Sequence, residues 1–242
     1  MTYSSSFITR SCAFGLAALV VLAGATASAQ EPLSVSVPVA ESAPAAAAGE
    51  TMTSLSHAEL DAFLERFAAM SGLSAKFREE KQMALLAAPL VNEGVIYFAP
   101  PGRLARHTTS PLASSMIIDG SRLTFGDARG VEAIGFEQNP VLGLFVSSFV
   151  KIFAGDRDAL AQMYSMELQG SPEGAWLLKL RPRLSPMDKV IEGIELRGEG
   201  LVVSTMVVHE LGGDTTTTTF TEVDTGRSFS AAEQTKLFRI PR

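Results

Sequence analysis

The sequence predicts an α+β domain with a predominantly antiparallel sheet of about ten or eleven strands. Apolar and polar residues alternate with a period of two over most of the chain, and Gly, Pro and Asp separate these runs. Helical periodicity occurs at the start of the domain and again in its middle, so helices do not alternate regularly with strands. This order favours consecutive strands that pair as hairpins.

The first residues have the pattern of a secretory signal. Arg10 precedes the apolar run 13–23, and Ala27-Ser28-Ala29 is a small-x-small cleavage site. The apolar run is too short to span a bilayer, and an uncleaved anchor is the alternative. The expected organisation is a signal peptide at 1–29, a disordered Pro- and Ala-rich linker at 30–53 and one domain at 54–242.

Composition excludes several classes of protein. Residues are 46% hydrophobic and 19% charged, and the net charge is -6, which argues against a disordered chain and against a nucleic-acid binder. The one cysteine, Cys12, falls in the predicted signal peptide and excludes a disulfide framework or a cysteine-based zinc site. The apolar excess therefore needs a large core or an interior that holds a ligand.

The domain begins with a helix. Ser56-His57-Ala58-Glu59 is a capping box, and the helix is expected to end near Gly72. Its apolar stripe has the spacing i, i+3, i+4, i+7 at Leu60, Phe63, Leu64 and Phe67. From Leu73 the period changes to two.

Strands follow in two groups around a helical insert. Asp119-Gly120 marks a hairpin, and Asn139-Pro140 caps an almost wholly apolar helix that extends to Phe153, before a short helix capped by Asp156. The expected strands before the insert are 73–78, 95–98, 104–109, 116–118, 123–125 and 131–136. Those after it are 166–169, 176–180, 191–197, 201–209 and 215–222.

Several motifs occur in an order that resembles the periplasmic outer-membrane lipoprotein carriers, the LolA-like family, and its divergent LolA-related branch most of all. The resemblance covers roughly residues 55–219. The motifs are Phe77-Arg78-Glu79-Glu80-Lys81, Gly94-Val95-Ile96-Tyr97-Phe98, Pro101-Gly102-Arg103-Leu104, Thr109-Ser110-Pro111, Phe153-Ala154-Gly155-Asp156 and the stretch from Trp176 to Pro182.

The resemblance implies an incomplete antiparallel β-barrel with a helical lid over an apolar cavity. Such a protein is a periplasmic monomer without a cofactor or catalytic site. It takes acyl chains of a lipoprotein or glycolipid from an inner-membrane exporter and passes them to an outer-membrane acceptor. It binds no nucleic acid and does not insert stably into a membrane.

We expect acyl chains to contact an apolar cavity. Its predicted lining is Leu64, Phe67, Phe77, Phe98, Phe125, Leu142, Phe145, Phe149, Trp176 and Met206. The family's lid arginine precedes the Pro of the third-strand motif, where this chain has Ala99-Pro100-Pro101. The basic residues Arg103 and Arg106 follow slightly later and are expected at the mouth or lid.

Catalytic and metal sites have little support in the sequence. No Gly-x-Ser-x-Gly elbow, Walker loop or His-Glu-x-x-His motif occurs, and His57, His107 and His209 lack metal-ligand spacing. Asp156 and Asp158 are better explained as a helix cap with a first-turn acid than as a catalytic pair. The alternative to a carrier is a protein-binding or sensor module on the same scaffold, and a hydrolase is more distant.

Overall fold

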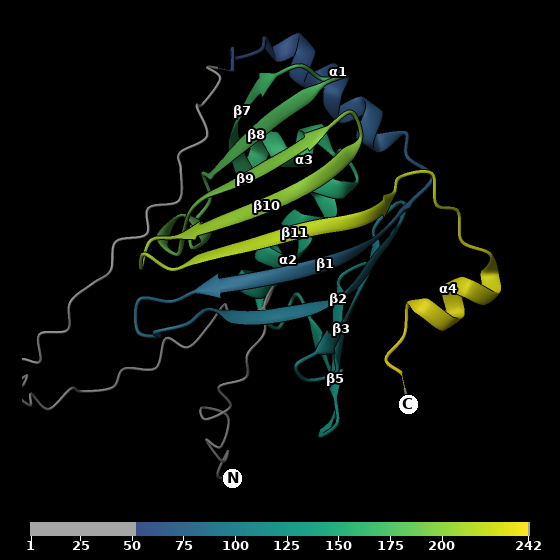
Figure 1. Ribbon diagram of the computed structural model, residues 1–242. Coiled ribbons are helices and arrows are strands. Elements are labelled where there is room, and N and C mark those ends of the chain that lie inside the picture. The colour runs from purple at the N-terminus through teal and green to yellow at the C-terminus, as the bar shows by residue number, and fades with distance from the viewer. Residues whose placement is uncertain (1–51, 242) are drawn as a thin grey trace, which may run out of the picture. The chain divides into compact units, whose positions relative to one another are not determined.

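One antiparallel sheet of eleven strands forms the centre of the molecule. The computed structural model describes residues 52–241, apart from the side chains of Val141 and Phe145. Along the sheet the order is β6-β5-β4-β3-β2-β1-β11-β10-β9-β8-β7 (Figure 1). The bounds are β1 Leu73–Gln82, β2 Leu90–Ala99, β3 Arg103–Ser110, β4 Ser114–Asp119, β5 Arg122–Asp127, β6 Gly130–Gly135, β7 Tyr164–Gly170, β8 Ala175–Pro182, β9 Ile191–Glu199, β10 Val202–Glu210 and β11 Thr215–Asp224.

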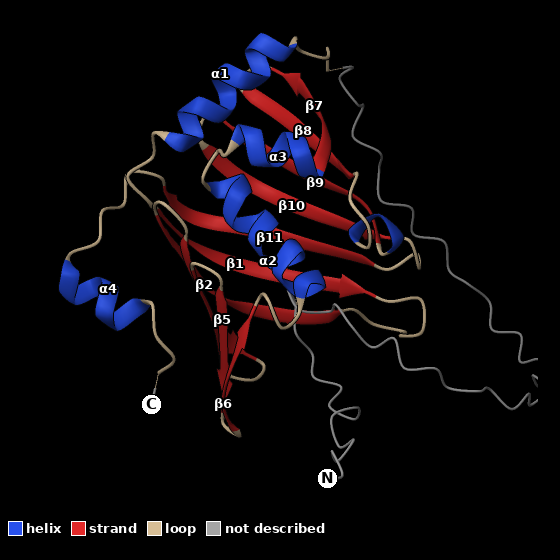
Figure 2. Ribbon diagram, turned by 180° about the vertical axis from the view of Figure 1, so that it is seen from behind, coloured by secondary structure: helices blue, strands red, loops and turns tan. Residues whose placement is uncertain are grey.

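The sheet does not close into a complete barrel. β6 and β7 end the strand order and do not pair with each other within the described residues. Three helices cover one face of the sheet, here called the inner face, as Figure 2 shows: α1 (His57–Ala68), α2 (Pro140–Phe153) and α3 (Arg157–Met163). A short turn of 3-10 helix, η1 (Met187–Lys189), precedes β9. This architecture confirms the predicted incomplete antiparallel barrel with a helical part.

The amino-terminal predictions fall outside this description. The expected signal peptide at 1–29 and the expected linker up to residue 51 belong to the part of the chain that the structure does not describe, so both stay predictions. The folded elements begin with α1, whose predicted capping box is present. Glu59 accepts a hydrogen bond from the backbone N–H of Ser56 at 2.8 Å, and the Ser56 hydroxyl accepts one from the N–H of Glu59 at 3.3 Å.

The end of α1 differs from the sequence prediction. The helix ends at Ala68 rather than near Gly72, because Gly72 has an extended, positive φ of 154° and leads directly into β1. A Cβ atom at Gly72 would lie 2.9 Å from the backbone oxygen of Phe98, so β1 and β2 approach too closely there for a side chain.

Local signals place α2 and α3 as predicted. Asn139 Oδ1 accepts a hydrogen bond from the N–H of Leu142 at 3.0 Å, and Asp156 Oδ1 accepts one from the N–H of Ala159 at 3.2 Å. Between the two helices Gly155 has a φ of 60° and passes so near α1 that a Cβ atom would lie 2.2 Å from the oxygen of Leu64. Glycine therefore lets α2 and α3 turn tightly beside α1.

A carboxyl-terminal helix, α4 (Ala231–Leu237), is absent from the sequence prediction. It packs on the face of the sheet opposite α2, here called the outer face. Phe238 is 5% exposed and lies in a small core with residues of β2, β3 and β4, namely Ala99, Ala105 and Ile117. Nε2 of His107 lies 2.7 Å from the backbone oxygen of Leu237. The carboxyl-terminal segment thus covers part of the outer face that would otherwise expose apolar residues.

Removal of the Phe238 ring tests this second core. We expect Phe238→Ala to lower the free energy of unfolding by about 3 kcal/mol, because a buried ring is lost and the rigid strands cannot close the space. Urea unfolding followed by circular dichroism measures the change. Leu85→Ala is the control, because Leu85 is 93% exposed and its truncation should be nearly neutral. Equal stability of the two variants would contradict the packing of α4.

The ion pair that links α2 to α3 should make stability depend on pH. Lys151 Nζ lies 2.6 Å from Asp156 Oδ2 and holds the pKa of Asp156 below its usual value, with a smaller contribution from the N–H of Ala159. A carboxyl with a lowered folded-state pKa stabilises the protein above its unfolded-state pKa of about 3.9, and this contribution is lost as the pH falls through the folded-state value.

Asp156→Asn keeps a side chain that can cap α3 but removes the charge. At pH 7 we expect a loss of at most about 1 kcal/mol, because solvent screens a pair whose side chains are 39% and 36% exposed. The difference from the unsubstituted protein should be smaller at pH 3 than at pH 7, because the stabilising charge is lost as the pH falls through the lowered folded-state pKa of Asp156. Urea titrations at both pH values test this, with Asp158→Asn as a control on an 85% exposed side chain. A difference that stays constant with pH would contradict the assignment.

Candidate functional site

Most of the predicted cavity residues lie between the inner face and its helices. Phe125 on β5 is half-buried, and Phe145 is on α2 with a side chain outside the described set. The others are buried, with exposures between 1% and 9%: Leu64, Phe67, Phe77, Phe98, Leu142, Phe149, Trp176 and Met206. The structure therefore brings these eight residues into one apolar layer. Whether that layer holds a ligand stays a prediction.

The aromatic rings of this layer form two groups. Phe63 and Phe67 of α1 pack on Trp176 of β8, with ring centroids 4.8 and 6.0 Å away. Phe153, at the end of α2, lies 6.2 Å from Phe98 and 6.5 Å from Phe220. The first group anchors α1 and the second anchors α2. Both are dense aromatic packings in which the protein's own helices contact the sheet.

The centre of α2 is also linked to the far edge of the sheet. Burial raises the pKa of Tyr164 on β7 to about 12, while a hydrogen bond with Ser148 of α2 opposes that rise. The Tyr164 hydroxyl also lies 3.4 Å from the sulfur of Met187. Both Ser148 and Tyr164 are at most 1% exposed. The polar interaction fixes the position of a helix whose other contacts are apolar and nondirectional.

A polar cluster that the sequence prediction missed lies on the same inner face. Glu79 of β1 is 0% exposed and pairs with Arg106 of β3 at 3.1 Å. Asn92 Nδ2 donates to the same Glu79 oxygen at 3.3 Å, and Arg106 Nη1 donates to Thr108 Oγ1 at 3.3 Å. The guanidinium also lies 4.2 Å from the centre of the Phe77 ring. Burial lowers the pKa of Arg106, and the charge of Glu79 opposes this shift.

The alternation of β1 contained a signal for this cluster. Leu73, Ala75 and Phe77 occupy inner positions, so the same period places Glu79 and Lys81 on the inner face as well. Lys81 is 5% exposed and pairs with Glu210 at 2.7 Å. Two consecutive inner positions of β1 are therefore ionic, where an ordinary core would have apolar side chains.

The two arginines predicted at the mouth or lid lie on opposite faces of the sheet. Arg106 points inward to Glu79. Arg103 lies on the outer face, where it donates to Gln234 of α4 at 3.1 Å and stands 5.0 Å from the centre of the Phe238 ring. The structure does not bring the two residues together, because positions three apart on a strand have opposite directions.

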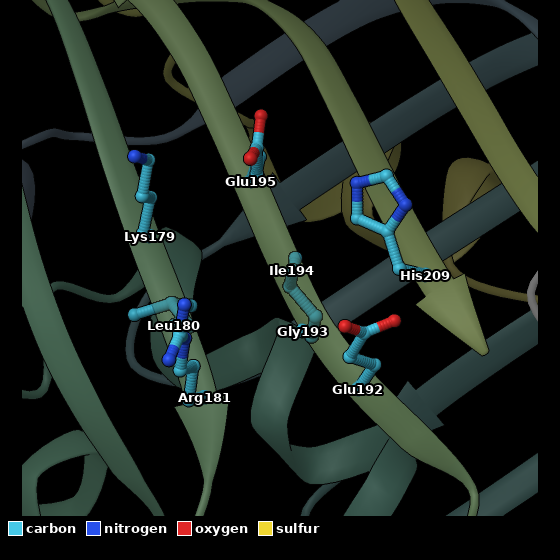
Figure 3. A pocket seen from close by; sticks show the side chains of 8 residues that line it. All are labelled: Lys179, Leu180, Arg181, Glu192, Gly193, Ile194, Glu195 and His209. Atoms are coloured by element: carbon cyan, nitrogen blue, oxygen red, sulfur yellow. The ribbon is translucent and has the colours of Figure 1, made fainter. Parts of the chain in front are cut away.

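Two hollows lie on the outer face. One, of about 240 Å³, has Lys179, Glu195 and His209 standing out from β8, β9 and β10 (Figure 3). The other, of about 560 Å³, lies over the middle of the sheet, where threonines of β11 face the Arg78–Glu93 ion pair of 2.7 Å. Both have charged, open walls, so neither is the predicted apolar cavity.

The titratable side chains do not gather into a metal site within residues 52–241: no group of three or more His, Cys, Asp or Glu is placed to hold an ion there. Asp156 caps α3, as predicted, and His107 lies against α4 with Nδ1 2.7 Å from Ser115 Oγ. Among the described helices, none is long and apolar enough to cross a membrane.

Several proteins of known structure are similar to the chain. Solved structures similar to the chain include a LolA superfamily protein from Nitrosomonas europaea, with a TM-score of 0.43, 9% identity and coverage of 75% of this chain and 97% of that one. A putative outer membrane lipoprotein-sorting protein domain from Vibrio parahaemolyticus has a TM-score of 0.44 and 10% identity, with coverage of 75% of this chain and 99% of that one. MucB in complex with MucA(peri) has a TM-score of 0.40 and 14% identity, with coverage of 73% of this chain and 58% of that one. No curated protein matches the sequence.

The family comparison covers nearly the whole described domain. Residues 52–236 match the family described as outer membrane lipoprotein carrier protein LolA-like. The match begins just before α1 and ends within α4, so it includes every strand of the sheet. The chain belongs to the LolA-like family of outer membrane lipoprotein carrier proteins.

Proposed function

We propose that this protein is a periplasmic carrier that binds the acyl chains of a lipoprotein or glycolipid against the inner face of its sheet. It takes this cargo from an inner-membrane exporter and delivers it to an outer-membrane acceptor. The observation that carries the proposal is the apolar layer under α2, in a chain of the LolA-like family. The predicted signal peptide supports a place outside the inner membrane.

The energetics of such binding need only apolar contact. Each CH₂ group transferred from water to an apolar site gains about 0.8 kcal/mol, so one long acyl chain can gain on the order of 10 kcal/mol before the costs of ordering. No catalytic group or cofactor is needed for binding or for release. Cargo then moves to whichever partner buries its chains better, which gives a direction without an energy source in the carrier.

The inner face is closely packed, so a carrier of this structure must open before it can bind acyl chains. Phe98 and Phe149 are each 1% exposed and Met206 is 3% exposed, and Phe98 packs against Phe153 of α2. Acyl chains can reach these residues only if a helix moves away from the sheet. α2 is the helix that must move, since its residues Phe149 and Phe153 belong to the apolar layer.

The chain offers a place to lock α2 in position. A Cβ atom at Gly102, in the turn between β2 and β3, would lie 3.6 Å from Val150 Cγ1 of α2. The Cβ atom of residue 150 lies farther away than 4 Å, so two cysteines at these positions would form a disulfide near the upper end of the usual Cβ–Cβ range of about 3.5–4.5 Å. The one natural cysteine, Cys12, lies in the predicted signal peptide, so a protein processed as predicted would contain only the engineered pair.

We expect the oxidised Gly102→Cys/Val150→Cys protein to bind a fluorescent fatty acid at least about tenfold more weakly than its reduced form. The lock holds α2 over the apolar layer, and a reductant should restore binding. The full chain is expressed with its own leader, purified from the periplasm and delipidated, and binding is followed by fluorescence titration. The single variants Gly102→Cys and Val150→Cys, treated with the same oxidant, are the controls.

Mass spectrometry of organic extracts provides the complementary result. Protein purified without delipidation should release acylated molecules, and the mass of these identifies the cargo. Equal binding by the oxidised and reduced double variant would contradict a role for α2 as a lid. A protein without extractable lipid or fatty-acid binding, recovered instead with a protein partner, would favour the protein-binding alternative.

A further inference from the structure

The polar cluster on the inner face contains an acceptor with no donor. Oε1 of Glu79 accepts hydrogen bonds from Arg106 and Asn92, whereas Oε2 is buried and has no partner among the described residues. A buried polar atom without a hydrogen bond costs free energy that folding does not recover. Ion pairs in protein cores can often be replaced by apolar side chains without loss of stability. The pairing with Arg106 and Asn92 accounts for Oε1, whereas nothing among the described residues accounts for the buried Oε2.

A second polar atom without a partner lies on the neighbouring strand. Thr218 of β11 stands directly opposite Glu79 in the register of β1 and β11. It is 2% exposed, and its Oγ1 is buried without a hydrogen bond. Side chains at directly paired positions have Cβ atoms about 5 Å apart, so Glu79 and Thr218 are neighbours on the inner face. One is a carboxylate acceptor, and the other is a hydroxyl that can donate or accept.

The charges near Glu79 Oε2 and Thr218 Oγ1 determine which ligand group could form hydrogen bonds with these two atoms. The negative charge of Glu79 is already balanced by Arg106, which is 6% exposed. A phosphate would face the unpaired carboxylate oxygen, and an ammonium group would add a second cation beside a buried guanidinium; both are unfavourable at low dielectric constant. An uncharged hydroxyl can donate to Glu79 Oε2 and accept from Thr218 Oγ1 without changing the net charge.

Apolar side chains lie immediately beside this polar position. Phe77 precedes Glu79 by two residues on the inner face, Phe220 follows Thr218 by two, and Met206 of β10 is paired in register with Thr218. All three are at most 8% exposed. A ligand that reaches Glu79 and Thr218 must therefore also contact apolar surface. A hydroxyl group next to an acyl chain has this combination.

We propose that Glu79 and Thr218 form a binding site for a hydroxyl group of an acylated ligand, such as a glycerol or sugar hydroxyl next to the ester or ether of its chain. The proposal rests on the proposed carrier function and makes it more specific, because it assigns selectivity to the inner face. Arg106 and Asn92 are positioning residues: they hold Oε1 and so leave Oε2 for the ligand.

The test compares probes that differ mainly in their headgroup. Delipidated full-chain protein is titrated with monopalmitoylglycerol, methyl palmitate and palmitoyl lysophosphatidic acid in competition with a fluorescent fatty acid. An alkyl glucoside distinguishes a sugar hydroxyl from a glycerol hydroxyl. We expect at least one hydroxyl-bearing neutral probe to bind about tenfold more tightly than methyl palmitate, a difference of about 1.4 kcal/mol. The anionic probe should show no such gain.

Thr218→Val removes the hydroxyl but keeps the shape of the side chain. We expect it to lose the preference for the neutral hydroxyl probe while its affinity for methyl palmitate stays the same. Its Tm should rise by about 2–4 °C, because a buried hydroxyl without a partner is replaced by a methyl group. Thr217→Val, one residue away and in the wall of the outer-face hollow, is the matched control and should keep the preference.

Glu79→Gln provides an independent variant. Its amide oxygen can stay with Arg106, so the unpaired acceptor becomes an N–H donor. A ligand hydroxyl would then have to accept at this atom and would lose the stronger hydrogen bond to a charged carboxylate, so the preference for a hydroxyl probe should fall. Equal affinity of the unsubstituted protein for the hydroxyl and methyl ester probes would overturn the proposal, as would a Thr218→Val protein that keeps the preference. Absence of binding for every probe would instead overturn the carrier function on which the proposal rests.

Discussion

An open antiparallel sheet with an apolar inner face must be covered, and α2 crosses the middle of that face, with α1 and α3 beside it (Figure 2). The helix is apolar on nearly all sides because it meets the sheet on one side and α3 and η1 on others. Its position depends on the aromatic contacts of Phe153 and on the interaction between Ser148 and Tyr164. The sheet needs an apolar cover, and α2 supplies it. Acyl chains offer the sheet the same kind of surface, so cargo could take the place of α2.

Local chemistry allowed most elements to be predicted. The box at Ser56 and Glu59, the cap at Asn139 and the turn at Asp119-Gly120 each depend on neighbours within about four residues, and all three occur in the structure. α4 was missed because none of its own residues is buried, so it lacks an apolar stripe. Phe229 and Phe238, which anchor it, flank the helix rather than lie within it.

The candidate site could be predicted only in part. Alternation placed Phe77 on the same face as Leu73 and Ala75, and the structure buries all three. The pairing of Glu79 with Arg106 depends on the register of β1, β2 and β3 together, and the position of Thr218 depends on β11, which is far away in sequence. Arg103 and Arg106 are three positions apart on β3, so the alternation of a strand directs them to opposite faces. The contact of Arg103 with α4 was not predicted, because α4 itself was not predicted.

The central place of β11 has a consequence for the order in which the molecule can assemble. β1 pairs with β11, so Lys76 lies beside Thr221, although 145 residues separate them in sequence (221 minus 76). The first six strands can form consecutive hairpins. One edge of β1, in the middle of the final sheet, stays unpaired until β11, the last of the described strands, has joined. Contacts this distant in sequence slow folding. A chain of this topology stays incomplete until its carboxyl-terminal part is present.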